Sequence, residues 1–188
     1  MKASVRAALC GILSALAVVI LMSVAVVPVM LYCAPILSGL CVAIAGEEFG
    51  WKYAFGVYAA ASFLSLLLVA DKETVCVFVL LSGAFTVLKY ILNCNVNNKS
   101  DKNTDKFIDN RIGKFIVKLA YINLACVSYY FAAVMLLGVP KDSFGGSVML
   151  IVFLIAGNIV MLAYDKAIDG VIAVYKIKFR KHIMKGKW

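Results

Sequence analysis

The chain has 188 residues, of which 64% are hydrophobic and 15% are charged, and its mean hydropathy is +0.96. A soluble domain has about 45–50% apolar and about 25% charged residues, and a core of this size cannot bury so many apolar side chains. The composition excludes a soluble fold, a disordered chain and a disulfide scaffold and predicts an all-α, polytopic membrane protein. The net charge of +9 indicates Lys and Arg kept on the cytoplasmic side of a membrane, and not nucleic acid as a partner.

The amino-terminal region predicts two membrane spans. Residues 7–46 carry no Asp, Glu, Lys or Arg, and 40 residues suffice for two crossings of about 20 residues each. The run is too long for a signal peptide, whose apolar part has about 7–15 residues. Pro28 and Pro35 interrupt the run and favour a break between helices. We therefore expect spans at 3–27 and 29–46.

The next two spans are predicted on either side of a charged corner. Trp51 and Tyr53 open the third span, at about 51–70, as expected of aromatic residues at a membrane interface. Asp71, Lys72 and Glu73 form the corner, and the fourth span follows at about 74–92.

The carboxy-terminal half predicts two further spans and two polar segments. Residues 93–110 are rich in Asn, Asp and Lys and are typical of a solvated loop. Spans five and six are expected at 112–139 and 147–175, in a single integral membrane domain. Residues 176–188 form a basic tail, which either binds anionic membrane lipid or only fixes the topology.

The distribution of positive charge predicts the orientation. Six spans place both termini on one side of the membrane. Seventeen of the 19 Lys and Arg residues then lie on that side, and only Lys72 and Lys141 lie on the other. Cytoplasmic loops carry an excess of Lys and Arg. We expect a protein of the cell membrane with both termini and the 93–110 loop in the cytoplasm.

Small residues follow one face of the first span. Ala7, Gly11 and Ala15 are spaced by four residues, which lets another helix approach closely in lipid. Gly56 and Ala60 form a similar pair in the third span. Either these faces pack inside the bundle, or they dock a separate membrane subunit.

Two amides are expected near mid-depth of the membrane. Asn123 lies about ten residues into span five, and Asn158 about eleven residues into span six. Polar groups at this depth are costly and mark candidate sites. The two amides bind each other or the polar groups of a ligand. Tyr129 and Tyr130 are expected closer to the outer face of the membrane than Asn123. They form either an aromatic wall of a ligand pocket or part of an aromatic belt at the membrane interface.

Charged residues near the ends of the spans add further candidates. Lys72 and Glu73 either guard a pocket mouth or only terminate two helices. Asp165 and Asp169 share a face with Asn158 and are expected to pair with Lys166 or with cations on neighbouring helices.

Motifs for enzymatic chemistry are incomplete. Glu47, Glu48 and Lys52 imitate part of the E-E-x-x-x-R motif of intramembrane CAAX-type proteases, but His182 is the only histidine and lies in the tail. Closely paired cysteines and a phosphate-cradling Gly-rich loop are also missing from the sequence. We expect a non-enzymatic protein with no cofactor and no metal site, and the role of Glu47 and Glu48 stays open.

The opening VRAALCGILSALAVVI resembles the first span of the S components of energy-coupling factor (ECF) transporters, in which an Ala-x-x-x-Ala stripe docks a coupling subunit. The matching positions are Ala7, Gly11 and Ala15, with glycine in place of the middle alanine. The length, the six expected spans and the cytoplasmic termini also fit, and the stretch from Tyr32 to Glu73 is similar to clostridial membrane proteins of this fold.

The resemblance implies a subunit that captures a vitamin-like small molecule on the outer side. It also implies a transmembrane coupling protein and two cytoplasmic ATPases as partners. An outer pocket would favour Asn123, Asn158, Tyr129, Tyr130, Lys72 and Glu73 as substrate-binding residues. The alternatives are a structural or scaffolding six-span protein, which needs no pocket, and a small secondary transporter, which usually has inverted repeats. The sequence does not identify the solute or the oligomeric state.

Overall fold

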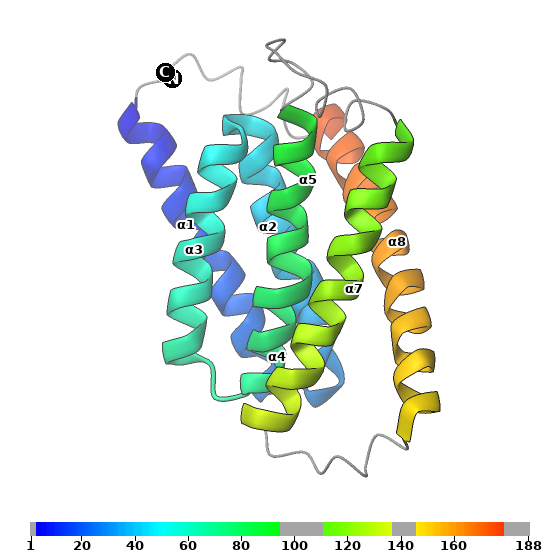
Figure 1. Cartoon of the computed structure of the whole chain (residues 1–188). Helices are drawn as coiled ribbons and strands as arrows, with labels where there is room; N and C mark the ends of the chain where they lie inside the picture. Colours follow the sequence, from blue (N-terminus) through cyan, green and yellow to red (C-terminus); the bar gives the residue numbers. More distant parts are fainter. Residues whose placement is uncertain (1–2, 95–110, 137–145, 179–188) are drawn as a thin grey trace.

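The computed structural model describes residues 3–94, 111–136 and 146–178, and these are arranged as a bundle of long helices (Figure 1). Every regular element within these ranges is helical. Helices satisfy their own backbone hydrogen bonds, which is the condition for crossing a lipid bilayer.

The first two helices are separated at Pro28, as the sequence predicts. Helix α1 (Ala3–Met22) is followed by two 3₁₀ turns, η1 (Ser23–Ala25) and η2 (Pro28–Leu31), and by α2 (Cys33–Phe49). Val27 is extended, with φ −127° and ψ 91°, because a residue before proline avoids the helical region.

Helix α2 continues past the expected boundary at residue 46 and includes Glu47 and Glu48. It ends at Gly50, whose φ is +92°, a conformation that glycine adopts without steric cost. Helix α3 (Trp51–Leu68) starts at the next residue. The two glutamates are therefore held on a rigid helix rather than in a loop.

The fourth rod has an irregular centre. It consists of α4 (Lys72–Val77), a π-helical segment η3 (Phe78–Gly83) and α5 (Ala84–Cys94). A π segment disturbs the regular hydrogen-bond ladder and leaves carbonyls for other donors.

Two neighbouring helices donate to the carbonyls of this π segment. The Tyr58 hydroxyl on α3 donates to Val79 O at 2.9 Å. The Tyr121 hydroxyl, on α7 (Arg111–Leu136), donates to Leu80 O at 2.8 Å. The tyrosines thus fix α3 and α7 to the same irregular turn.

The last long helix, α8 (Gly146–Lys178), runs antiparallel to α7 and ends at the same end of the bundle at which α1 begins (Figure 1). We call this end of the bundle, where α1 begins and α2, α5 and α8 end, the basic end. Among the Lys and Arg residues that the structure describes, all but Lys72 lie in the half of the bundle toward the basic end.

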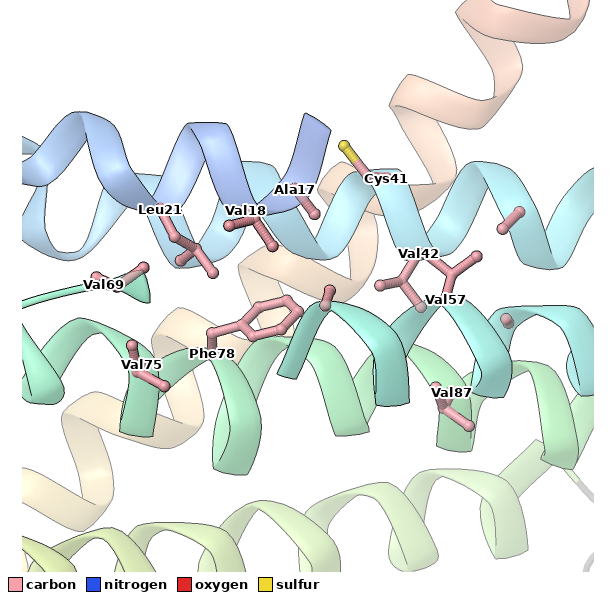
Figure 2. Packing of buried hydrophobic residues seen from close by; sticks show 13 residues of the cluster. Ala17, Val18, Leu21, Cys41, Val42, Val57, Val69, Val75, Phe78 and Val87 are labelled. Carbon is pink, nitrogen blue, oxygen red and sulfur yellow. The ribbon is translucent and has the colours of Figure 1, made fainter. Parts of the chain in front are cut away.

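The core has two parts. The first joins α1, α2, α3 and the fourth rod through small and branched side chains around Phe78, including Ala17, Val18, Leu21, Val42 and Val57 (Figure 2). The second joins α2, α5, α7 and α8, and its members are Ala43, Phe85, Ile122, Cys126, Met161, Tyr164, Ile168 and Ile172.

The outer surface of the bundle is also apolar. Ile12, Phe63 and Leu67 are each more than 60% exposed. By length and composition, five helical segments among the described residues can cross a membrane: Ser4–Ala25, Val29–Phe49, Trp51–Leu68, Lys72–Asn93 and Gly113–Ala132. The chain is therefore built as an all-helical, multi-pass membrane protein.

Candidate functional site

At the end of the bundle opposite the basic end, Glu73 joins two tyrosines from different helices. Glu73 lies in the first turn of α4. Its Oε1 accepts hydrogen bonds from the Tyr129 hydroxyl on α7 at 3.0 Å and from the Tyr32 hydroxyl before α2 at 3.3 Å. The structure thus brings together two candidate residues, Glu73 and Tyr129. It adds Tyr32, which the sequence analysis did not select.

The two neighbouring candidates have other contacts. The Lys72 ammonium donates to Leu66 O at 2.8 Å and to Val69 O at 3.0 Å, and it thereby caps the carboxyl end of α3. The half-buried Tyr130 ring meets Phe131 edge-on, with the ring centroids 6.0 Å apart. Lys72 therefore has a structural contact that fits the helix-terminating interpretation.

The two mid-depth amides meet. Asn158 Nδ2 on α8 donates to Asn123 Oδ1 on α7 at 3.0 Å. Each Nδ2 also donates to the carbonyl one turn earlier, Leu119 O for Asn123 and Leu154 O for Asn158, at 2.9 and 2.8 Å. Asn158 Oδ1 is buried and accepts no hydrogen bond from the part of the chain that the structure describes. The sequence left open whether the two amides bind each other or a ligand, and the structure shows that they bind each other.

The amide pair and the Glu73 group lie at different depths. Asn123 and Tyr129 are six residues apart on α7, which corresponds to about 9 Å along a helix. A small solute that contacts Glu73 and Tyr129 would therefore have to extend inward to reach the Asn158 acceptor.

The small-residue stripe Ala7, Gly11 and Ala15 faces away from the bundle. All three residues are exposed, and a Cβ added at Gly11 would meet nothing within 4 Å. The buried side of α1 is formed instead by Ser14, Ala17, Val18 and Leu21. The stripe is therefore not used for packing among the described helices.

Of the predicted pair on α3, Gly56 is exposed, and a Cβ added there also meets nothing within 4 Å, whereas Ala60 is partly buried. The open small-residue face is therefore that of α1, and α3 adds only Gly56 to it.

An ion-pair network lies in the half of the bundle toward the basic end. The Lys89 ammonium on α5 is 2.8 Å from Asp165 Oδ1 and 2.7 Å from Asp169 Oδ1, both on α8. It also donates to Asp165 O at 2.9 Å. The Lys118 ammonium on α7 donates to Asp165 Oδ2 at 2.6 Å. Asp165 and Asp169 pair with cations on neighbouring helices, one of the two arrangements that the sequence predicted.

A second ion pair and a cavity adjoin this network at the basic end. Lys176 Nζ on α8 is 2.5 Å from Glu47 Oε1 on α2. A cavity of about 230 Å³ lies between α2, α5 and α8. Its polar lining residues are Glu47, Lys89, Tyr90, Asn93, Asp169 and Lys176. Glu47, whose role the sequence left open, belongs to this site.

The sequence analysis missed Lys89 and Tyr90 as site residues. Lys89 contributes to the charge asymmetry of the sequence, but it also lies within the predicted span 74–92, and an ionisable residue in a span is a site candidate. Its exposed fraction of 5% shows that its charge is held inside the protein. Tyr90 gave no comparable signal, because an aromatic residue near a span end is common.

Metal-binding clusters of three or more His, Cys, Asp or Glu side chains do not occur among the described residues. Cys10, Cys33, Cys41, Cys76 and Cys126 are free thiols. Comparison with protein-family models, with curated proteins and with solved structures finds no match to this chain.

Proposed function

We propose that the protein is a substrate-capture membrane subunit of an ATP-driven uptake transporter, of the ECF S-component kind. The observation that carries the proposal is the outward-facing stripe Ala7, Gly11 and Ala15. Small side chains allow close contact between helices in lipid, and the stripe has no such contact within the described bundle. A transmembrane coupling protein docks there and links the subunit to two cytoplasmic ATPases.

The proposal includes six spans, with α8 as the sixth, and both termini in the cytoplasm of the cell. Helix α8 has 33 residues, and about 20 residues suffice to cross the hydrocarbon layer. The concentration of Lys and Arg toward the basic end supports its cytoplasmic location. Reporter fusions after residues 70 and 178 test the orientation: only the first is expected outside.

The proposed solute site is the Glu73 group on the outer side. Glu73 lies on α4 and Tyr129 on α7, and Tyr32, which precedes α2, also donates a hydrogen bond to Glu73. Polar groups that converge from separate helices are the usual means by which a membrane protein orients a small ligand. The open acceptor of Asn158 lies deeper and extends the same site.

Photo-cross-linking tests the docking face. A photoreactive amino acid is placed at position 11 on α1 or at position 170 on α8. Gly170 is a matched control, because a Cβ added there also meets nothing within 4 Å and α8 lies on the far side of the bundle from α1 (Figure 1). In native membranes we expect a defined membrane-protein adduct at position 11 and none at position 170. Equal yields would contradict the proposal.

A scaffolding function is the second candidate. The amide–amide contact of Asn123 and Asn158 favours it, since these side chains then join helices rather than hold a ligand. Mass spectrometry of the gently purified protein separates the candidates. A capture subunit retains a small molecule that Glu73→Gln releases, whereas a scaffold retains none that depends on Glu73.

A further inference from the structure

The cavity at the basic end has a size that limits what it could hold. Its volume of about 230 Å³ exceeds the share of one liquid water, about 30 Å³, several-fold. It is smaller than the pockets of about 300–1,000 Å³ that hold drug-sized molecules. The cavity therefore fits a chemical group of a few heavy atoms.

Three polar groups of the lining retain unused hydrogen-bonding capacity. The Tyr90 hydroxyl is buried and has no hydrogen-bond partner among the described residues. Glu47 uses one carboxylate oxygen for Lys176, and Asp169 uses one for Lys89. The Asp169 side chain is 68% exposed, so its second oxygen is accessible to a ligand.

Lys89 is already engaged by α8. Its ammonium forms ion pairs with the Asp165 and Asp169 carboxylates and donates a hydrogen bond to the Asp165 carbonyl. The cation that remains available in the cavity is Lys176, which is 44% exposed and has one carboxylate contact.

The charges of the lining balance, with carboxylates at Glu47 and Asp169 and ammoniums at Lys89 and Lys176. A net-neutral site favours a ligand that is itself zwitterionic over an anion or a metal cation. We propose that the cavity binds an aminoethyl phosphate group. Its ammonium lies between Glu47 and Asp169, and its phosphate oxygens accept from Lys176 and the Tyr90 hydroxyl.

Two sources supply this group: the headgroup of phosphatidylethanolamine and a free solute such as glycerophosphoethanolamine. On α8, Ile177 follows the lining residue Lys176 and is 71% exposed, so it offers an apolar surface for an acyl chain and favours the lipid. The inference is independent of the proposed transport function, because it uses neither the stripe nor the Glu73 group.

The test counts lipids retained by the full chain. The protein is reconstituted in nanodiscs of phosphatidylglycerol mixed with phosphatidylethanolamine or phosphatidylcholine, extracted in mild detergent and measured by native mass spectrometry. We expect retention of phosphatidylethanolamine about tenfold above phosphatidylcholine, whose trimethylammonium donates no N–H hydrogen bond. Glu47→Gln lowers this retention about tenfold and Tyr90→Phe about fivefold.

Matched variants separate binding from folding. Glu48→Gln removes the same charge on the adjacent residue, and Tyr53→Phe removes a hydroxyl near the same end; neither residue lines the cavity. Both are expected to retain lipid as the wild type does. Tyr90→Phe keeps the ring, which lies so close to Gly46 that a Cβ there would be 2.7 Å from it, so packing is preserved.

A second experiment identifies whether the aminoethyl phosphate group comes from a lipid or from a free solute. Glycerophosphoethanolamine is titrated into delipidated protein while thermal unfolding is followed. Selective lipid retention assigns the site to the lipid, and a rise in melting temperature that Glu47→Gln abolishes assigns it to a free solute; both support the inference. Equal retention of the two lipids together with no thermal shift overturns it, as do equal losses in Glu48→Gln and Glu47→Gln.

Discussion

The two halves of the bundle are held together by different interactions. Helices α1, α2 and α3 and the fourth rod meet mainly through small and branched apolar side chains around Phe78. Helix α8 is joined to α7 and to α5 by polar contacts as well. Between α7 and α8 these are the Asn123–Asn158 amide pair and the Lys118–Asp165 ion pair. Between α5 and α8 they are the Lys89 ion pairs and a hydrogen bond of 3.1 Å between Thr86 Oγ1 and the Tyr164 hydroxyl.

The difference shows two ways in which helices can associate within a membrane. In lipid, apolar contact between helices gains little from the hydrophobic effect, so helices associate through close packing or through hydrogen bonds. The amino-terminal half relies mainly on close packing and has a small-residue face on α1 that packs against no described helix. The carboxy-terminal half adds polar contacts to its apolar core, and near the basic end these surround a cavity.

The largest expected change in stability concerns the core of the amino-terminal half. Phe78 is fully buried at the centre of the first core, whereas Phe63 is 66% exposed. Phe78→Ala should lower the free energy of unfolding by about 3–5 kcal/mol, because it leaves a cavity that close-packed neighbours fill only in part. Unfolding by sodium dodecyl sulfate in mixed micelles measures the change. A similar loss for Phe63→Ala would show that the core location is not what matters.

A smaller effect is expected in the ion-pair network. Lys89→Met leaves Asp169 without its ion pair and Asp165 with Lys118 alone. Removing one partner of a buried pair costs about 3 kcal/mol or slightly more, which the same unfolding assay detects. Lys166→Met, at an exposed position of α8, is the control and should change little. If both variants lose less than about 1 kcal/mol, the network does not hold α5 to α8.

The amide pair should contribute least. Asn158→Leu removes the hydrogen bond to Asn123 and also the buried, unpartnered Asn158 Oδ1. Interhelical hydrogen bonds in membranes average about 0.6 kcal/mol, so we expect a loss below about 1 kcal/mol in the unfolding assay. A double-mutant cycle with Asn123→Leu isolates the interaction energy of the pair. A coupling energy near zero would show that the pair does not stabilise the bundle.

The sequence predicts the approximate positions of the helices, because uncharged runs and the break at Pro28 are local features. It also predicts that Asn123 and Asn158 lie at similar depth, since depth follows from counting along each helix. The rotation of each helix about its axis is not local. For this reason the sequence left open whether the stripe of Ala7, Gly11 and Ala15 packs inside, and the structure shows it outside.

The basic-end site could not be predicted for the same reason. Lys89 and Asp165 are 76 residues apart, and nothing in the spacing of either helix indicates their pairing. The cavity also depends on α2 extending to Phe49, which places Glu47 on a helix near Lys176. The expected boundary at residue 46 put Glu47 outside that helix.

The most direct test of the proposed function is the composition of the complex purified gently from native membranes. Native mass spectrometry is applied to the wild type, to Gly11→Leu and to the control Gly170→Leu, since a side chain fits at both positions without a clash. We predict that the wild type and Gly170→Leu retain one membrane protein and two ATP-binding subunits, and that Gly11→Leu loses all three. A wild type without ATP-binding partners, or a Gly11→Leu variant that retains them, would contradict the account.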